Sequence, residues 1–209
     1  MADKKEVETI LTPEGRLINE NLFEKDKFDE KATPSYKIEM AFDPKDFADI
    51  EAALGRAAAD KWGAGAEDDY FDGKIIDPII DGDKMARRRA ENDKPGDAYE
   101  GKVVIRAHTI FNKHGQDAPG GVAVFGPDVG EIGVANRQDI YQGCYGQAAL
   151  TIGNYIEAKT QARALMFYLS AFQKTRDGDR LVSQRDYTKV FKPVGRAEGE
   201  GTSRRKSRG

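Results

Sequence analysis

The sequence predicts a mainly β protein of the α+β class: a small Greek-key β-barrel with one main helix and long loops. Five to seven segments have strand patterns, only one segment has a strong helical repeat, and Gly- and Asp-rich stretches separate them. The 209 residues suffice for one such domain with appendages. We expect the domain to span residues 1–192 and a disordered basic tail to span residues 193–209.

The first part of the chain is expected to contribute two strands and the main helix. Residues 16–23 follow a turn signal, and residues 36–42 alternate between apolar and polar side chains. The helix is expected to begin at Pro44, because Asp43 is a good N-cap and apolar residues then recur at helical spacing. Gly63 is expected to end it.

The middle of the chain is expected to hold a long excursion and then further strands. Residues 63–96 are rich in Gly, Asp and basic residues, with a short helix expected near residues 84–91. The strands expected after the excursion are residues 102–111, 122–125 and 131–135.

Two long strands, residues 144–156 and 163–172, carry aromatic side chains on the face opposite their aliphatic ones. The rings expected to face outward are Tyr145 and Tyr155 in the first strand and Tyr168 and Phe172 in the second. Exposed rings on a sheet can stack on nucleobases, which contributes roughly 1–3 kcal/mol per base. The alternative is that these rings pack under a loop or against the helix.

Charge is distributed unevenly along the chain. The net charge is −3, but residues 193–209 hold five cationic side chains against two carboxylates, a net charge of +3, so residues 1–192 carry −6. A second basic cluster contains Arg87, Arg88 and Arg89. A basic tail favours contact with a polyanion, whereas the second cluster can equally be a solvated loop.

Several classes of protein are disfavoured by the sequence. No apolar run approaches the roughly 18 residues of a membrane span, and the first residues lack the apolar segment of a secretory signal. Cys144 is the only cysteine, so no intrachain disulfide can form and a reducing cytosol is expected. We interpret Cys144 as a small buried side chain rather than a reactive thiol.

The chain shows no recognisable catalytic motif. It contains no phosphate-binding loop, no nucleophile elbow and no paired-histidine zinc motif, so we expect neither an enzyme nor a cofactor. His108 and His114 have no cysteine partners for zinc. Aspartates between residues 68 and 83 could suggest a two-metal nuclease, but Asp-Gly pairs are ordinary turn residues. No metal site is expected.

Four blocks of the sequence together resemble the bacteriophage single-stranded DNA-binding proteins formerly described as a domain of unknown function. The blocks are Pro78–Asp83 (PIIDGD), Tyr99–His108 (YEGKVVIRAH), Ile140–Ala149 (IYQGCYGQAA) and Leu169–Asp179 (LSAFQKTRDGD). The resemblance covers roughly residues 9–182. It implies an oligonucleotide/oligosaccharide-binding (OB) barrel that coats single-stranded DNA during phage replication and recombination, in the cytoplasm of the infected bacterial host.

The expected interface combines cations for phosphates with rings for bases. Expected phosphate contacts are Lys102, Arg106, Lys113 and Arg163; expected stacking groups are His108, Tyr145, Tyr155, Tyr168 and Phe172. Arg87, Arg88 and Arg89 could clamp over the strand, and Arg204, Arg205, Lys206 and Arg208 of the tail could add affinity for duplex DNA. Other possible partners are replication or recombination proteins. Two alternative functions remain: a metal-dependent nuclease on the Asp-rich excursion, and a structural or assembly β-barrel of a virion.

Overall fold

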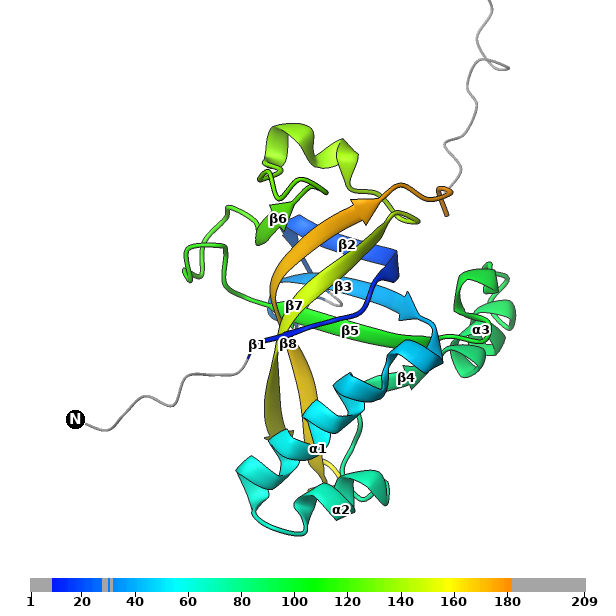
Figure 1. The fold of residues 1–209 in the computed structure, drawn as a ribbon, viewed down its shortest axis with the longest axis vertical. Coiled ribbons are helices and arrows are strands. Elements are labelled where there is room, and N and C mark those ends of the chain that lie inside the picture. The colour runs from blue at the N-terminus through cyan, green and yellow to red at the C-terminus, as the bar shows by residue number, and fades with distance from the viewer. Residues whose placement is uncertain (1–8, 28–29, 31, 182–209) are drawn as a thin grey trace, which may run out of the picture.

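The computed structural model describes residues 9–27, 30 and 32–181, and these residues form a sheet-dominated α+β fold (Figure 1). The strands are β1 (Thr9–Leu11), β2 (Gly15–Asp26), β3 (Ser35–Phe42), β4 (Ile79–Asp81), β5 (Val103–Thr109), β6 (Ala123–Phe125), β7 (Tyr145–Ile156) and β8 (Arg163–Arg176). The α-helices are α1 (Ala48–Trp62), α2 (Ala66–Phe71) and α3 (Gly82–Ala90). Three 3-10 helices complete the described elements: η1 (Pro44–Asp46), η2 (Asp97–Tyr99) and η3 (Val134–Asp139).

The strands pair in the order β1-β7-β2-β3-β5-β8-β6, and β7 also pairs with β8. The pairings among β7, β2, β3, β5 and β8 therefore return to their starting strand. β5 runs parallel to β8, whereas the other four pairs of this ring are antiparallel. A closed ring of pairings leaves few open strand edges. It also has an inside and an outside, so the alternate side chains of each strand point either into the ring or away from it.

The interior of this ring is the main hydrophobic core. As the alternation of residues 36–42 predicts, Tyr36, Ile38, Met40 and Phe42 are buried there. Helix α1 adds Ile50 and Leu54 to the same core. In Figure 1, α1 runs below the crossing strands and α2 lies at the foot of the molecule, beside the ends of β7 and β8.

The helical region differs in detail from the expectation. Asp43 does act as a cap, since its side chain accepts from the backbone N–H of Lys45, but it caps η1, and α1 begins only at Ala48. Gly63 ends α1 as predicted, with a φ of 90° that favours glycine. The short helix expected near residues 84–91 is α3. The expectation of one main helix missed α2.

Three short elements also depart from the sequence reading. Residues 131–135 are not a strand: only Glu131 makes a bridge, to Phe125, and η3 follows. Gly130 before this segment and Gly133 within it favour turns over sheet pairing. β1 and β4 were not expected as strands, because three residues are too few to show an alternation.

The second long strand contains a β-bulge that reverses its faces. Ala149 pairs with Ala171 and Leu150 pairs with Leu169, so Ser170 is the extra residue. Before the bulge odd-numbered side chains face the core, and after it even-numbered ones do. Phe172 is consequently buried, with 1% of its surface exposed. The prediction that Phe172 faces outward for stacking on DNA is therefore wrong.

The last described residues lie beside α3. Leu181 packs against a small cluster that includes Ile18, Ala86 and Tyr99. The predicted tail, residues 193–209, lies outside the described residues. Within the described residues, no helix is both long and apolar enough to cross a membrane.

Candidate nucleic-acid interface

A row of outward side chains crosses four strands of the sheet. The register places Lys37 of β3 opposite His108 of β5, His108 beside Tyr168 of β8, and Tyr168 opposite Thr151 of β7. Neighbouring strands lie about 4.8 Å apart, so the row extends roughly 15 Å across the sheet. It brings together two of the side chains singled out from the sequence, His108 and Tyr168.

Two hollows lie one after the other along this row. The first, which we call the Lys37 hollow, has a volume of about 560 Å³, and the second, the Tyr168 hollow, has about 590 Å³. The Lys37 hollow is lined by Asn19, Ala32, Thr33, Ser35, Lys37, Ile38, Glu39, Arg106, Ala107, His108 and Ile110. The Tyr168 hollow is lined by His108, Thr109, Ile110, Phe111, Asn112, Thr151, Tyr168, Leu169 and Ser170. Since His108 and Ile110 line both, the two hollows form one groove over the outer faces of β3, β5 and β8.

The ring of Tyr168 is held in the groove by its neighbours. It meets His108 edge to face, with ring centroids 5.9 Å apart. On the other side it lies over Gly153, where an added Cβ would come within 2.3 Å of Tyr168 Cε2. The absence of a side chain at Gly153 therefore makes room for the ring, which remains 42% exposed.

Arg106 is oriented by a buried carboxylate. Its Nε donates to Glu39 Oε2 at 2.5 Å, while the Tyr99 hydroxyl donates to Glu39 Oε1 at the same distance. Glu39 is only 9% exposed, but the Arg106 side chain is 56% exposed and can still reach a phosphate. Burial and the neighbouring carboxylate raise the pKa of Tyr99 above its ordinary value, so its hydroxyl stays a donor.

Two other side chains of the row, Lys37 and His108, also interact with their surroundings. Lys37 donates to Asp26 Oδ2 at 2.5 Å, so this cation is paired with a carboxylate, as Arg106 is. Burial lowers the pKa of His108 below its usual range and favours the neutral imidazole. A neutral ring next to Tyr168 is suited to stacking on a base.

The structure places the other two predicted rings outside the groove. Tyr145 lies at the far end of β7, where the guanidinium of Arg176 sits 3.5 Å from its ring centroid. Tyr155 is 43% exposed near the opposite end of β7, across from Ala164, and lines neither hollow. Of the five stacking groups predicted from sequence, the groove therefore contains two, His108 and Tyr168.

Three further cations that were predicted to contact phosphates line neither hollow: Lys102, Lys113 and Arg163. Lys113, in the loop after β5, pairs with Glu131, which follows β6. Arg163 donates to Asp69 Oδ2 at 2.6 Å at the foot of the molecule. Lys102 is half-buried just before β5 and lines neither hollow.

Helix α3 carries the predicted Arg87, Arg88 and Arg89 near one end of the groove. Its Met85 sulfur lies 3.9 Å from Arg106 Nη2, so the helix adjoins the Lys37 hollow. Arg87 and Arg88 are exposed, whereas Arg89 donates to the carbonyl of Pro95 at 2.7 Å and lies over the ring of Tyr99. Arg204, Arg205, Lys206 and Arg208 lie outside the described residues.

Sequence reasoning missed several groove residues, above all Lys37, Ile110 and Phe111. Lys37 lies on the polar face of the well-predicted strand 36–42, and that alternation was a signal that could have found it. Phe111 follows β5 and is 49% exposed, but its position in the Tyr168 hollow depends on the fold of the following loop.

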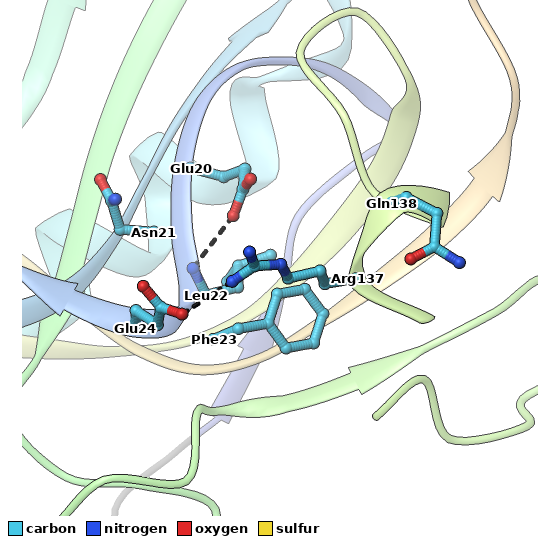
Figure 2. Close-up of a pocket in the computed structure, with 7 residues that line it drawn as sticks. All are labelled: Glu20, Asn21, Leu22, Phe23, Glu24, Arg137 and Gln138. Carbon is cyan, nitrogen blue, oxygen red and sulfur yellow. Dashed lines mark hydrogen bonds and ion pairs between the residues drawn. The ribbon is translucent and has the colours of Figure 1, made fainter. Parts of the chain in front are cut away.

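A third hollow, of about 340 Å³, lies between β2 and η3 (Figure 2). Figure 2 shows Arg137 reaching toward Glu24, whose carboxylate it meets at 2.7 Å, while Glu20 accepts from the backbone N–H of Leu22. Burial raises the pKa of Glu20 above its usual range. With two carboxylates and one guanidinium, this hollow does not suit a polyanion.

The Asp-rich excursion offers no assembled metal site in the part of the chain that the structure describes. No group of three or more His, Cys, Asp or Glu side chains there is close enough to hold a metal ion. Asp69 and Asp72 instead form ion pairs with Lys74 at 3.1 and 2.9 Å.

Comparisons with solved structures find phage proteins with a similar fold. The single-stranded DNA-binding protein of bacteriophage Enc34, solved in complex with single-stranded DNA, is 18% identical, with a TM-score of 0.58 over 83% of this chain and 89% of that chain. Gp2.5, a single-stranded DNA-binding protein encoded by bacteriophage T7, is 10% identical, with a TM-score of 0.57 over 90% of this chain and 97% of that one. A search of curated proteins found no match.

The sequence of this chain matches the model of a protein family. The model described as the single-stranded DNA-binding protein of Enterobacter phage Enc34 matches residues 8–201, nearly the whole chain. The match agrees with the resemblance carried by the four sequence blocks, and it includes every strand that forms the groove. The chain therefore belongs to the family of the phage Enc34 single-stranded DNA-binding protein.

Proposed function

We propose that this protein binds single-stranded DNA along the groove over β3, β5 and β8, without an enzymatic step. The observation that carries the proposal is the row from Lys37 to Thr151, in which a cation, two rings and a hydroxyl lie in register across four strands. Duplex bases are stacked inside the helix, whereas the bases of a single strand can reach such rings.

We further propose that the ring of pairings is an OB-type Greek-key barrel. The order β2-β3-β5-β8-β7, with its parallel β5–β8 pair, supports this assignment. Barrels of this type bind oligonucleotides on the face of their second and third strands, which here are β3 and β5, and through the loop between their first two strands. Ala32 and Thr33 of that loop line the Lys37 hollow.

Base stacking would contribute more to the binding affinity than unpaired positive charges would. Lys37 and Arg106, the cations that line the groove, each have a carboxylate partner, so a phosphate would have to share them. Stacking is tolerant of sequence, because every base has a π-face. The protein would accordingly coat single strands of varied sequence during phage replication and recombination, in the cytoplasm of the infected host.

The test is a fluorescence-anisotropy titration with oligo-dT and with a duplex of equal length, at moderate salt. A protein ending at Lys192 is used beside the full chain, so that the basic tail cannot mask the preference of the body. Tighter binding of the single strand is expected. Equal or tighter duplex binding by the shortened protein would contradict the proposal, and magnesium-dependent loss of labelled strand would point to a nuclease.

A further inference from the structure

Two residues belong to the linings of both hollows, and we call their side chains the wall. His108 and Ile110 line both the Lys37 hollow and the Tyr168 hollow. His108 lies in β5, and Ile110 comes two residues later, directly after the end of the strand, so both lie on the same face. The two hollows have nearly equal volumes, about 560 and 590 Å³. Both fall within the roughly 300–1,000 Å³ typical of sites for small organic ligands, so each has room for one base.

The two hollows are too far apart to hold a stacked pair of bases. Residues of β3 line one hollow and residues of β8 line the other, and these strands lie on opposite sides of β5, roughly 10 Å apart. Successive bases of a stacked strand lie only about 3.4 Å apart. A strand that enters both hollows must therefore separate two neighbouring bases. Apolar side chains do this in other nucleic-acid complexes, where parting a base step costs about a few kcal/mol.

We propose that the groove holds two consecutive bases apart, one in each hollow, with the wall of His108 and Ile110 inserted between them. The inference rests on the proposed function and deepens it. In the Tyr168 hollow the base would meet the rings of Tyr168 and Phe111, and in the Lys37 hollow it would lie beside Lys37. The protein should then favour weakly stacking strands, so oligo-dT should bind more tightly than oligo-dA.

The separation can be measured with two adjacent 2-aminopurines, whose coupled circular dichroism signal requires that they stack on each other. The pair is moved step by step along the shortest oligo-dT that binds with full affinity. We expect the signal to fall strongly at one position and to persist at the others. Persistence at every position, or an equal loss at all positions, would overturn the proposal.

A matched pair of variants assigns the effect to the wall. Ile110→Ala should restore at least half of the lost signal, whereas Ile156→Ala, at a half-exposed isoleucine that lines neither hollow, should restore none. Thermal unfolding of both variants checks the fold. If oligo-dT binds more tightly than duplex but the signal never falls, the separation fails while single-strand binding stands. If oligo-dT does not bind preferentially, the proposed function itself fails.

Discussion

At the scale of single residues, Tyr168 is the side chain on which the groove depends most. It occupies the middle of the row, it is 42% exposed, and both Gly153 and His108 fix the position of its ring. A ring that is held in place loses little conformational freedom when a base stacks on it, so more of the stacking energy appears as affinity.

Tyr168→Ala should weaken binding of single-stranded DNA by roughly 1–3 kcal/mol. Tyr155→Ala is the matched control, because Tyr155 is equally exposed but lines neither hollow. Anisotropy titrations measure both affinities, and thermal unfolding verifies that each variant folds. A loss as large for Tyr155→Ala as for Tyr168→Ala would place the strand on the wider face of β7 and β8.

The depressed pKa of His108 predicts a pH dependence of stability. The folded state disfavours the protonated ring, so the unfolded state binds more protons between the folded pKa and the ordinary value of about 6.5. The free energy of unfolding should therefore fall as the pH drops below about 6.5. Denaturant unfolding at pH 7.5 and pH 5.5 should show a smaller loss for His108→Gln than for the unchanged protein or for His114→Gln. An undiminished loss in His108→Gln would show that other groups cause it.

At the scale of elements, strand alternation predicts which side chains of β3 are buried, whereas a bulge reverses the predicted faces in the second half of β8. The faces of residues 36–42 follow directly from alternating side chains. In β8 the extra residue Ser170 reverses the faces, and the apolar sequence around it gives no sign of the reversal. Phe172 therefore looks like a surface ring in the sequence but lies in the core.

Phe172→Ala should lower the free energy of unfolding by about 3–5 kcal/mol, because it removes a fully buried aromatic ring. Phe111→Ala should change stability far less, since Phe111 is half exposed, but it should weaken single-strand binding. Urea unfolding and anisotropy titration of the two variants separate the two roles. A small stability change for Phe172→Ala would mean that the ring is not part of the core.

Only part of the candidate site could be predicted from the sequence, because the rest depends on the register between strands. Arg106, His108 and Tyr168 stand out because each lies on the polar face of a strand with a clear pattern. Lys37 has the same property, but its place beside His108 follows from the β3–β5 register. Register depends on long-range pairing, which local alternation does not encode.

At the scale of the whole molecule, the negative net charge is compatible with DNA binding because the acidic groups are concentrated. Residues 44–77, which include α1 and α2, hold nine carboxylates against four cations, a net charge of −5 out of the −6 of residues 1–192. The strands that form the groove, β3, β5 and β8, instead hold five cationic side chains against one carboxylate, and the basic tail adds a further net charge of +3.

Deletion of the tail should change the salt dependence of binding. If residues 193–209 make about three or four phosphate contacts, a protein ending at Lys192 should show a slope of log K against log salt shallower by roughly three units on duplex DNA. The slope on single strands should change less, because single strands release fewer counterions per contact and stacking remains. Identical slopes for the two proteins would assign the tail to another role.

The location of the bound strand is tested most directly by photocrosslinking with an oligo-dT that carries 5-bromouracil, followed by mass spectrometry of the linked peptides. We expect crosslinks in the groove, at Tyr168, His108 or Phe111, and their loss when unlabelled oligo-dT competes. Crosslinks at Tyr145 or Tyr155, with none in the groove, would show that the strand binds elsewhere on the sheet and that the proposed groove is wrong.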